Sequence, residues 1–265
     1  MTRLAMKEMR VLLTGATGGI GAALAVELTD AGAFVLLHGR NRERLDEIAR
    51  LCGGRAQTVQ GDLNCAEDRE RVRLAAEAQR CNVLLNNAGV NEFGIFEQTD
   101  IERVIATNVT SPMLLTQSLL PYLTGRPAAM IVNLGSTFGA IGYPGYVAYC
   151  ASKHAIRGFS ESLKRELSDS RVEVIYVSPR ATITDMNAGA ANDANVALGV
   201  TQDSAERVAE VIIAAMQRSQ SRVQLGAVER AQVKMNALFP GVVDRAIGKQ
   251  LKTIKRFANH EEGSL

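Results

Sequence analysis

Short apolar runs alternate along the chain with longer segments in which apolar residues recur every three or four positions. The short runs predict strands at residues 10–14, 34–38, 57–60, 83–86, 129–134, 172–177 and 222–225. The longer segments predict helices at residues 20–31, 42–51, 67–79, 101–123, 146–167 and 205–218. Most of the strands are apolar throughout, which is typical of parallel strands covered on both faces.

This alternation predicts an α/β fold: a three-layer, doubly wound, Rossmann-like parallel sheet between two layers of helices. The 265 residues contain no internal repeat, low-complexity stretch or linker, so we expect a single domain over residues 1–265. Residues 226–265 lie beyond the last predicted strand, and we expect them to form a C-terminal helical extension.

Composition and charge exclude several classes of function. The formal net charge of +2 is too small to indicate a nucleic-acid partner. The chain has no uncharged apolar run near the roughly 20 residues that span a bilayer, and from its charged first residues we expect no secretory leader. The four cysteines, Cys52, Cys65, Cys81 and Cys150, lack metal-binding spacing. We therefore expect a reduced, cytoplasmic setting and no metal site.

A glycine-rich turn joins the first predicted strand to the first predicted helix. Residues 14–21 read TGATGGIG, with glycines at Gly15, Gly18, Gly19 and Gly21. Glycine lets a backbone turn sharply and approach a pyrophosphate, and a helix N-terminus offers unpaired N–H groups to a phosphate. We expect a dinucleotide phosphate here; the alternative is a tight turn that binds nothing.

The end of the second predicted strand indicates which dinucleotide binds. A cofactor without a 2′-phosphate favours an acidic side chain at this point, but the sequence supplies Arg40. A guanidinium matches a phosphate in geometry and charge, so we expect NADP(H) rather than NAD(H). The alternative is that Arg40 and Arg42 simply begin a solvated helix.

Further motifs follow in order along the chain. Asp62-Leu63 comes after the third strand, Asn86-Asn87-Ala88-Gly89 ends the fourth, and Asn108 lies in a helix. Ser136 follows the fifth strand, and Tyr149 and Lys153 form a Y-x-x-x-K motif. Together with the glycine turn, they resemble the short-chain dehydrogenase/reductase family, in its compact single-domain branch. The resemblance extends to about Leu225.

The resemblance implies two sets of site residues. The expected catalytic residues are Asn108, Ser136, Tyr149 and Lys153. The expected cofactor-binding residues are Gly15, Thr17, Gly18, Gly19, Ile20, Gly21, Arg40, Asn41, Asp62, Leu63, Asn87, Ala88, Gly89, Tyr149, Lys153, Pro179, Thr182 and Thr184.

Spacing suggests how the catalytic residues would work. Tyr149 and Lys153 are four residues apart, so a helix places them on one face. We expect the Lys153 ammonium to lower the pKa of Tyr149, tuning it as an acid for carbonyl reduction and a base for alcohol oxidation. Ser136 is expected to bind the substrate oxygen. The resemblance implies that Lys153 also binds the nicotinamide ribose and that Asn108 holds a water linking Lys153 to solvent.

The sequence departs from the family pattern after the sixth predicted strand. Pro179 and Thr184 match that pattern, but Arg180 stands where glycine is usual. One hypothesis is that Arg180 reaches into the pocket and pairs with an acidic substrate group or a cofactor phosphate. The reading we prefer is that it points to solvent or pairs with a nearby acid.

Two later segments are less regular. Residues 186–199 are rich in Ala, Asn and Gly, which predicts a mobile loop that closes on the ligand. Further on, Val243, Ala246, Ile247, Leu251, Ile254 and Phe257 form one helical stripe opposite Arg245, Lys249, Lys252, Lys255 and Arg256. We prefer a helix docked on its own domain or a partner subunit; contact with an anionic membrane surface is the alternative.

Together these features predict an NADP(H)-dependent oxidoreductase that transfers a hydride between nicotinamide and a small-molecule carbonyl or secondary alcohol. Two rivals are a non-catalytic nucleotide-binding protein that keeps the fold and an epimerase or dehydratase of the extended branch. Family resemblance implies a homodimer or homotetramer.

Overall fold

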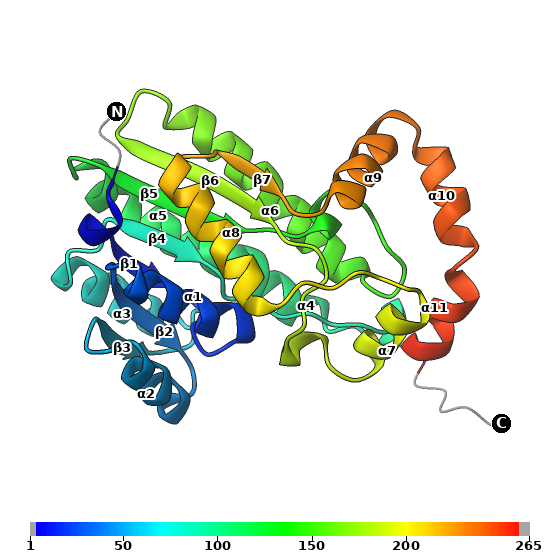
Figure 1. The fold of residues 1–265 in the computed structure, drawn as a ribbon, viewed down its shortest axis with the longest axis horizontal. Coiled ribbons are helices and arrows are strands. Elements are labelled where there is room, and N and C mark those ends of the chain that lie inside the picture. Colours follow the sequence, from blue (N-terminus) through cyan, green and yellow to red (C-terminus); the bar gives the residue numbers. More distant parts are fainter. Residues whose placement is uncertain (1–3, 260–265) are drawn as a thin grey trace.

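A computed structural model describes residues 4–259 and contains a seven-stranded parallel sheet between two layers of helices (Figure 1). The strands are β1 (Arg10–Leu13), β2 (Phe34–Gly39), β3 (Ala56–Gln60), β4 (Val83–Asn86), β5 (Ala129–Leu134), β6 (Val172–Ser178) and β7 (Arg222–Gln224). Their order, β3-β2-β1-β4-β5-β6-β7, and their parallel pairing confirm the predicted doubly wound fold.

Eleven α-helices connect and extend these strands within the described residues. They are α1 (Gly19–Asp30), α2 (Arg42–Leu51), α3 (Ala66–Ala78), α4 (Ile101–Ile105), α5 (Ser111–Thr124), α6 (Val147–Glu166), α7 (Ala190–Ala197), α8 (Ala205–Arg218), α9 (Ala227–Leu238), α10 (Pro240–Gly248) and α11 (Leu251–Ala258). Short helices of other types are η1 (Met6–Glu8), η2 (Phe96–Gln98), η3 (Ala106–Thr110), η4 (Thr137–Gly139) and η5 (Asp185–Asn187).

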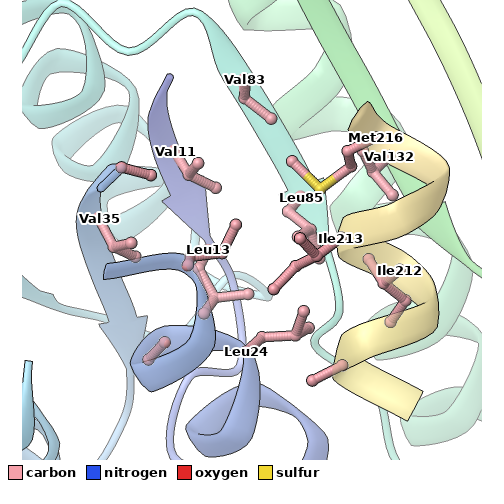
Figure 2. Close-up of a cluster of buried hydrophobic side chains, with 14 of the residues drawn as sticks. Val11, Leu13, Leu24, Val35, Val83, Leu85, Val132, Ile212, Ile213 and Met216 are labelled. Carbon is pink, nitrogen blue, oxygen red and sulfur yellow. The ribbon is translucent and has the colours of Figure 1, made fainter. Parts of the chain in front are cut away.

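Each face of the sheet has its own apolar core. On one face, α1, α2 and α8 pack against the central strands, and Figure 2 shows Leu24 of α1 and Met216 of α8 in the same cluster as Leu85 of β4. On the other face, α3, α5 and α6 pack against the sheet around Leu115 and Leu119. Strands covered on both faces are mostly apolar, which explains their nearly continuous apolar runs.

The strand order creates a crevice at the carboxyl edge of the sheet. β1 lies beside β4, although β2 and β3 separate them in sequence. The connections that follow β1 and β4 therefore leave in opposite directions, and ligands of such sheets bind in the crevice between them.

The turn between β1 and α1 requires glycine at two positions. Gly15 has a φ of +64°, a conformation that other residues rarely adopt. A Cβ on Gly21 would overlap the carbonyl oxygen of Gly15 and lie 2.8 Å from Nδ2 of Asn87. Gly18 is different, because a Cβ there would come no closer than 3.6 Å to its nearest neighbour.

The prediction of one helix over residues 101–123 was wrong in its middle. A π-helical segment, η3, separates α4 from α5, and the N–H of Ser111 donates to the carbonyl of Ala106. Pro112 has no N–H, so the carbonyl of Asn108 lacks its usual α-helical donor. This break in the hydrogen-bond ladder accompanies the π-turn at Asn108.

The prediction of a loop over residues 186–199 was also wrong, because α7 occupies part of that segment. Four of its eight residues are alanine, the strongest helix former, and this outweighs the asparagines. Gly189 (φ +66°) precedes the helix and Gly199 (φ +64°) follows its last turn. Ala191 and Ala194 are buried, and α7 packs against α11.

The C-terminal stripe forms two helices, α10 and α11, rather than one. Its member Ile254 is buried, with 1 % exposure, and Phe257 is half-buried, so this part of the stripe faces inward. In Figure 1, α9, α10 and α11 curve away from the sheet as an arc at one end of the molecule. Residues 260–265 of the predicted extension lie outside the described residues. Within residues 4–259, no helix is long and apolar enough to cross a membrane.

The core around Leu85 generates a stability prediction. We expect Leu85→Ala to lower the free energy of unfolding by about 3–5 kcal/mol, because it leaves a cavity in a close-packed cluster. The matched control is Leu51→Ala, since the Leu51 side chain is 65 % exposed and should contribute less than about 1 kcal/mol. Urea unfolding of both variants measures the difference. Equal losses would contradict the packing described here.

The glycine turn generates a second prediction. We expect Gly21→Ala to lower the free energy of unfolding by about 1–3 kcal/mol, because the new methyl group must displace backbone atoms. Gly18→Ala serves as the control, because Gly18 has a φ of −81° and free space at the Cβ position. Thermal unfolding of the two variants tests this contrast, and a Gly21→Ala protein as stable as the wild type would refute it.

Candidate active site

A cavity of about 370 Å³ opens at the carboxyl edge of the sheet. It is lined by most of the residues predicted for the site: Gly15, Thr17, Gly18, Gly19, Ile20, Gly21, Arg40, Asp62, Leu63, Asn87, Ala88, Gly89, Ser136, Tyr149, Lys153, Pro179, Thr182 and Thr184. Segments that are distant in sequence therefore meet around one space. Asn41 and Asn108 are the two predicted residues that do not line it.

The start of α1 has the properties of a phosphate site. Its N-cap, Gly18, has no side chain to bond the first N–H groups, and no acidic residue lies in the first turn. These N–H groups and the positive end of the helix dipole face the cavity. A Cβ on Gly19 would lie 2.7 Å from Cγ2 of Thr184, so any other residue at this position would have to displace Thr184. The turn thus fits an anionic group held by backbone N–H donors.

Asn87 and Thr14 hold this turn against the end of β4. Nδ2 of Asn87 donates to the carbonyl oxygens of Thr14 and Gly15, both at 2.9 Å. Oγ1 of Thr14 accepts from the N–H groups of Asn87 and Ala88, both at 3.1 Å. These four hydrogen bonds fix the distance between the glycine turn and the segment that follows β4.

Arg40 supplies positive charge at one end of the cavity. Its side chain is exposed at the end of β2 and has no ion-pair partner among residues 4–259. His38, two residues earlier, is buried, and burial lowers its pKa to about 4, although its contact with the Gly61 carbonyl opposes this shift. His38 is therefore neutral near pH 7 and adds no charge beside Arg40. Near this end, Asp62 accepts from the N–H of Asn64 through Oδ1 at 2.9 Å.

The structure gives Asn41 a local role instead of a place in the cavity wall. It is the N-cap of α2, and its Oδ1 accepts from the N–H of Arg44 at 2.8 Å. Asparagine is a favoured N-cap residue because it satisfies an otherwise unpaired N–H. The asparagine just before α2 therefore indicates a helix cap and not a cofactor contact.

Three of the four expected catalytic side chains, Ser136, Tyr149 and Lys153, line the cavity. α6 carries Tyr149 and Lys153 one turn apart, with Nζ of Lys153 5.5 Å from the centre of the Tyr149 ring. Lys153 is buried and donates to the carbonyl of Leu134 at 3.1 Å. Ser136 follows β5 and caps η4, accepting from the N–H of Phe138 at 3.1 Å.

The electrostatic expectation for Tyr149 was wrong in this structure. Burial raises the pKa of Tyr149 above its usual value, and the group that opposes this shift is the Ser136 hydroxyl, not Lys153. Burial also lowers the pKa of Lys153 to about 8, because an ammonium is costly in an apolar surrounding. Desolvation is therefore the largest influence on the pKa of both groups.

Asn108 lies behind the cavity wall and supports it. Its side chain is buried, donates to the carbonyl of Val90 at 2.9 Å and accepts from the Val90 N–H at 2.8 Å. It also donates to Oγ of Ser152 at 3.0 Å, which links η3 to α6. The π-turn leaves its backbone carbonyl without the usual donor from residue 112.

Arg180 pairs with acidic residues, as in the reading preferred from the sequence. Its guanidinium donates to both carboxylate oxygens of Asp203, at 2.9 and 2.7 Å. Its Nη1 lies 3.7 Å from Oε2 of Glu229 on α9. Both carboxylates are largely buried, with 13 % and 14 % side-chain exposure. The charge of Arg180 is thus paired with two carboxylates of the chain, although Arg180 also borders the cavity.

Sequence reasoning missed some of the cavity wall. The additional lining residues are His38, Gly39, Asn64, Val90, Thr107, Leu134, Gly135, Asp185, Met186 and Asn187. Nearly all flank a recognised motif, so proximity in sequence was the available signal. The contact between Asn64 and Thr107 could not be predicted from the sequence, because the two residues lie in distant segments. In the structure, Nδ2 of Asn64 donates to Oγ1 of Thr107 at 3.1 Å.

Comparison with known proteins gives matches over most of the chain. The family model described as "short chain dehydrogenase" matches residues 9–195. "Dehydrogenase/reductase SDR family member 7B" of Bos taurus is 31 % identical over 271 aligned positions, covering 94 % of this chain and 83 % of that protein. "Nodulation protein G" of Rhizobium sp. (strain N33) is 35 % identical over 175 positions, covering 64 % of this chain and 71 % of that protein.

Solved structures show the same fold. A short-chain dehydrogenase from Sphingobium yanoikuyae in complex with NADPH superposes with a TM-score of 0.74 at 28 % identity, covering 89 % of this chain and 96 % of that chain. A 3-ketoacyl-(acyl-carrier-protein) reductase from Brucella melitensis complexed with NADH gives 0.76 at 22 % identity, covering 83 % and 97 %. With a family match over residues 9–195 and a shared fold, this chain belongs to the short-chain dehydrogenase/reductase family of NAD(P)-dependent oxidoreductases.

Proposed function

We propose that this chain transfers a hydride between NADP(H) and the carbonyl or secondary alcohol of a small molecule, with Tyr149 as the general acid and base. The observation that carries the proposal is one shared cavity. Ser136, Tyr149 and Lys153 line it together with the glycine turn and Arg40. A dinucleotide likewise lies along one crevice, with its phosphates at the glycine turn.

The residues present fit such a cofactor. The start of α1 and the turn at Gly15–Gly21 would hold the pyrophosphate through backbone N–H groups. Asp62 and Leu63 would border the adenine, and Asn87, Ala88 and Gly89 would line the middle of the cofactor. Pro179, Thr182 and Thr184 would border the nicotinamide, where Lys153 would also bind the ribose. When bound, the nicotinamide supplies or accepts the hydride.

Tyr149 would manage the proton that accompanies the hydride. Its raised pKa keeps the hydroxyl protonated near neutral pH, so it donates its proton to a carbonyl oxygen during reduction. Ser136 would donate a hydrogen bond to the same oxygen and stabilise the negative charge that develops there. In alcohol oxidation, Tyr149 would first pass its proton towards Lys153, and the resulting phenolate would accept the proton of the alcohol.

Lys153 and Asn108 would restore the proton on Tyr149. An ammonium on Lys153 stabilises negative charge on the Tyr149 oxygen after the proton leaves. The pKa of Lys153, about 8, allows this amine to exchange protons near neutral pH. The carbonyl of Asn108, to which Pro112 has no N–H to donate, would hold a water between Lys153 and solvent.

Arg40 supports the preference for NADP(H). Its exposed guanidinium has no acidic partner in the described part of the chain, and it lies at the end of β2 where no acid is present to accept from a ribose hydroxyl. A 2′-phosphate would give it a charge-assisted, bidentate partner.

Assembly and location complete the proposal. α4 and α5 expose the apolar side chains of Ile101, Met113 and Leu114, which supports contact with a second copy in a homodimer or homotetramer. We also propose a cytoplasmic location, supported by four free cysteines.

The role of Tyr149 is tested by Tyr149→Phe. We expect kcat to fall by about 10²–10⁴-fold in a panel of carbonyls and secondary alcohols followed at the nicotinamide absorbance, because the ring remains and only the proton donor is lost. NADPH binding, measured by fluorescence, should stay within about twofold, which separates catalysis from folding. A variant that keeps wild-type kcat would refute the assignment.

Arg40→Ala tests the cofactor preference. We expect the Kd for NADPH to rise by about 10–100-fold, because a charge-assisted hydrogen-bonded pair is lost, while the Kd for NADH stays unchanged. Arg42→Ala is the control, since Arg42 already pairs with Asp46 at 2.9 Å. Equal weakening of both cofactors, or tighter wild-type binding of NADH, would overturn the preference for NADP(H).

A further inference from the structure

The arc formed by α9, α10 and α11 leaves one side uncovered. No residue of α9 or α10 is buried, although both helices carry many apolar side chains. An isolated helix of this length is marginal in water, so its stability depends on packing against something else. We call the exposed side chains of these three helices the outer arc.

Contacts on the inner side fix the direction in which the outer arc faces. Nδ2 of Asn236 on α9 donates to the carbonyl of Ala140 at 3.0 Å. The hydroxyl of Tyr143 donates to Oε1 of Gln250 at 2.8 Å, just before α11. Ile254 of α11 is buried close to Gly145. The inner sides of the helices therefore face the segment between η4 and α6, and the outer arc faces solvent.

Large apolar side chains gather at the corner where α9 meets α10. Val228, Met235 and Leu238 on α9 are 64 %, 43 % and 71 % exposed, and their spacing of seven and three residues places them along one side of the helix. Phe239 and Val242, at the start of α10, are 58 % and 54 % exposed. Such a concentration of exposed apolar side chains marks an interaction surface.

The same helices carry a net positive charge that exceeds that of the whole chain. Residues 227–259 contain seven basic residues and two acidic ones, and the seven basic residues are all exposed: Arg230, Lys234, Arg245, Lys249, Lys252, Lys255 and Arg256. One of the two acids, Glu229, faces inward to Arg180. Because the whole chain has 30 basic and 28 acidic residues, the remainder has an excess of acidic residues. The outer arc is thus a basic surface with an apolar corner.

This charge argues against a second copy as the occupant. A twofold contact places the same patch of both copies face to face, which would bring the basic residues of both arcs together. Like charges at an interface oppose association. An anionic lipid surface instead offers negative headgroups to the basic side chains and an apolar interior to the corner.

We propose that the outer arc docks this protein on an anionic lipid bilayer, with Leu238, Phe239 and Val242 inserted at the interface and the basic side chains against the headgroups. The arc is anchored to the segment that leads into α6, the helix that carries Tyr149. Docking would therefore hold the segment before α6 close to the lipid surface.

Vesicle flotation of the full chain tests the proposal at about 0.15 M salt. We expect binding to phosphatidylcholine vesicles that contain about 30 mol % phosphatidylserine, and at least tenfold weaker binding to pure phosphatidylcholine. Lys249→Gln combined with Lys252→Gln should weaken binding more than about tenfold, because each basic residue near an anionic surface contributes about fivefold. Leu238→Asp combined with Phe239→Asp should abolish it.

Matched variants control for charge and exposure elsewhere. Arg165→Gln with Arg218→Gln removes two exposed charges outside the arc, and Leu51→Asp with Leu74→Asp changes two side chains that are 65 % and 51 % exposed. Both controls should bind vesicles like the wild type, and thermal unfolding should show that every variant is folded.

Three results would overturn the proposal. The first is no binding of the full chain to anionic vesicles, and the second is an equal loss of vesicle binding in the control variants. The third is that the full chain forms an oligomer without binding vesicles, and that this oligomer dissociates in Leu238→Asp/Phe239→Asp. Sedimentation velocity of the same samples detects the last result, which would assign the corner to a second copy.

Discussion

The hydrogen bonds between Asn87 and the glycine turn set the geometry on which the rest of the site depends. One amide group binds two consecutive carbonyls, so the end of β4 and the start of α1 cannot separate without breaking both bonds. The same arrangement brings Gly21 so close to the carbonyl of Gly15 that no Cβ fits between them. Everything that lines the cavity, from Arg40 to Lys153, is positioned relative to a helix start that is fixed in this way.

Burial is the second organising effect, and it acts on the reactive groups directly. Burial raises the pKa of Tyr149 and lowers the pKa of Lys153 to about 8. A neutral phenol is the form that donates a proton, and an amine that titrates near pH 8 is suited to returning one. The same apolar packing that stabilises α6 against the sheet therefore also adjusts the acid–base chemistry.

Much of the fold could be predicted from the sequence, because strands buried on both faces leave a simple apolar signature. The motif residues of the cavity could also be named, since each lies at a strand end or a helix start. The exceptions have physical causes. The π-turn at Asn108 depends on the missing N–H of Pro112 and on distant partners at Val90 and Ser152, which no local periodicity contains. The shifted pKa of Tyr149 depends on desolvation, which exists only in three dimensions.

The ion pairs of Arg180 make the residues at three distant positions depend on one another. The family usually has glycine at this point, but here a glycine would leave the largely buried carboxylates of Asp203 and Glu229 without their cation. Removing the cation leaves two largely buried carboxylates uncompensated, so a return to glycine is tolerated only if both acids change as well. Residues 180, 203 and 229 should therefore covary among related chains, and grafting any one of them alone into a relative would be strongly epistatic.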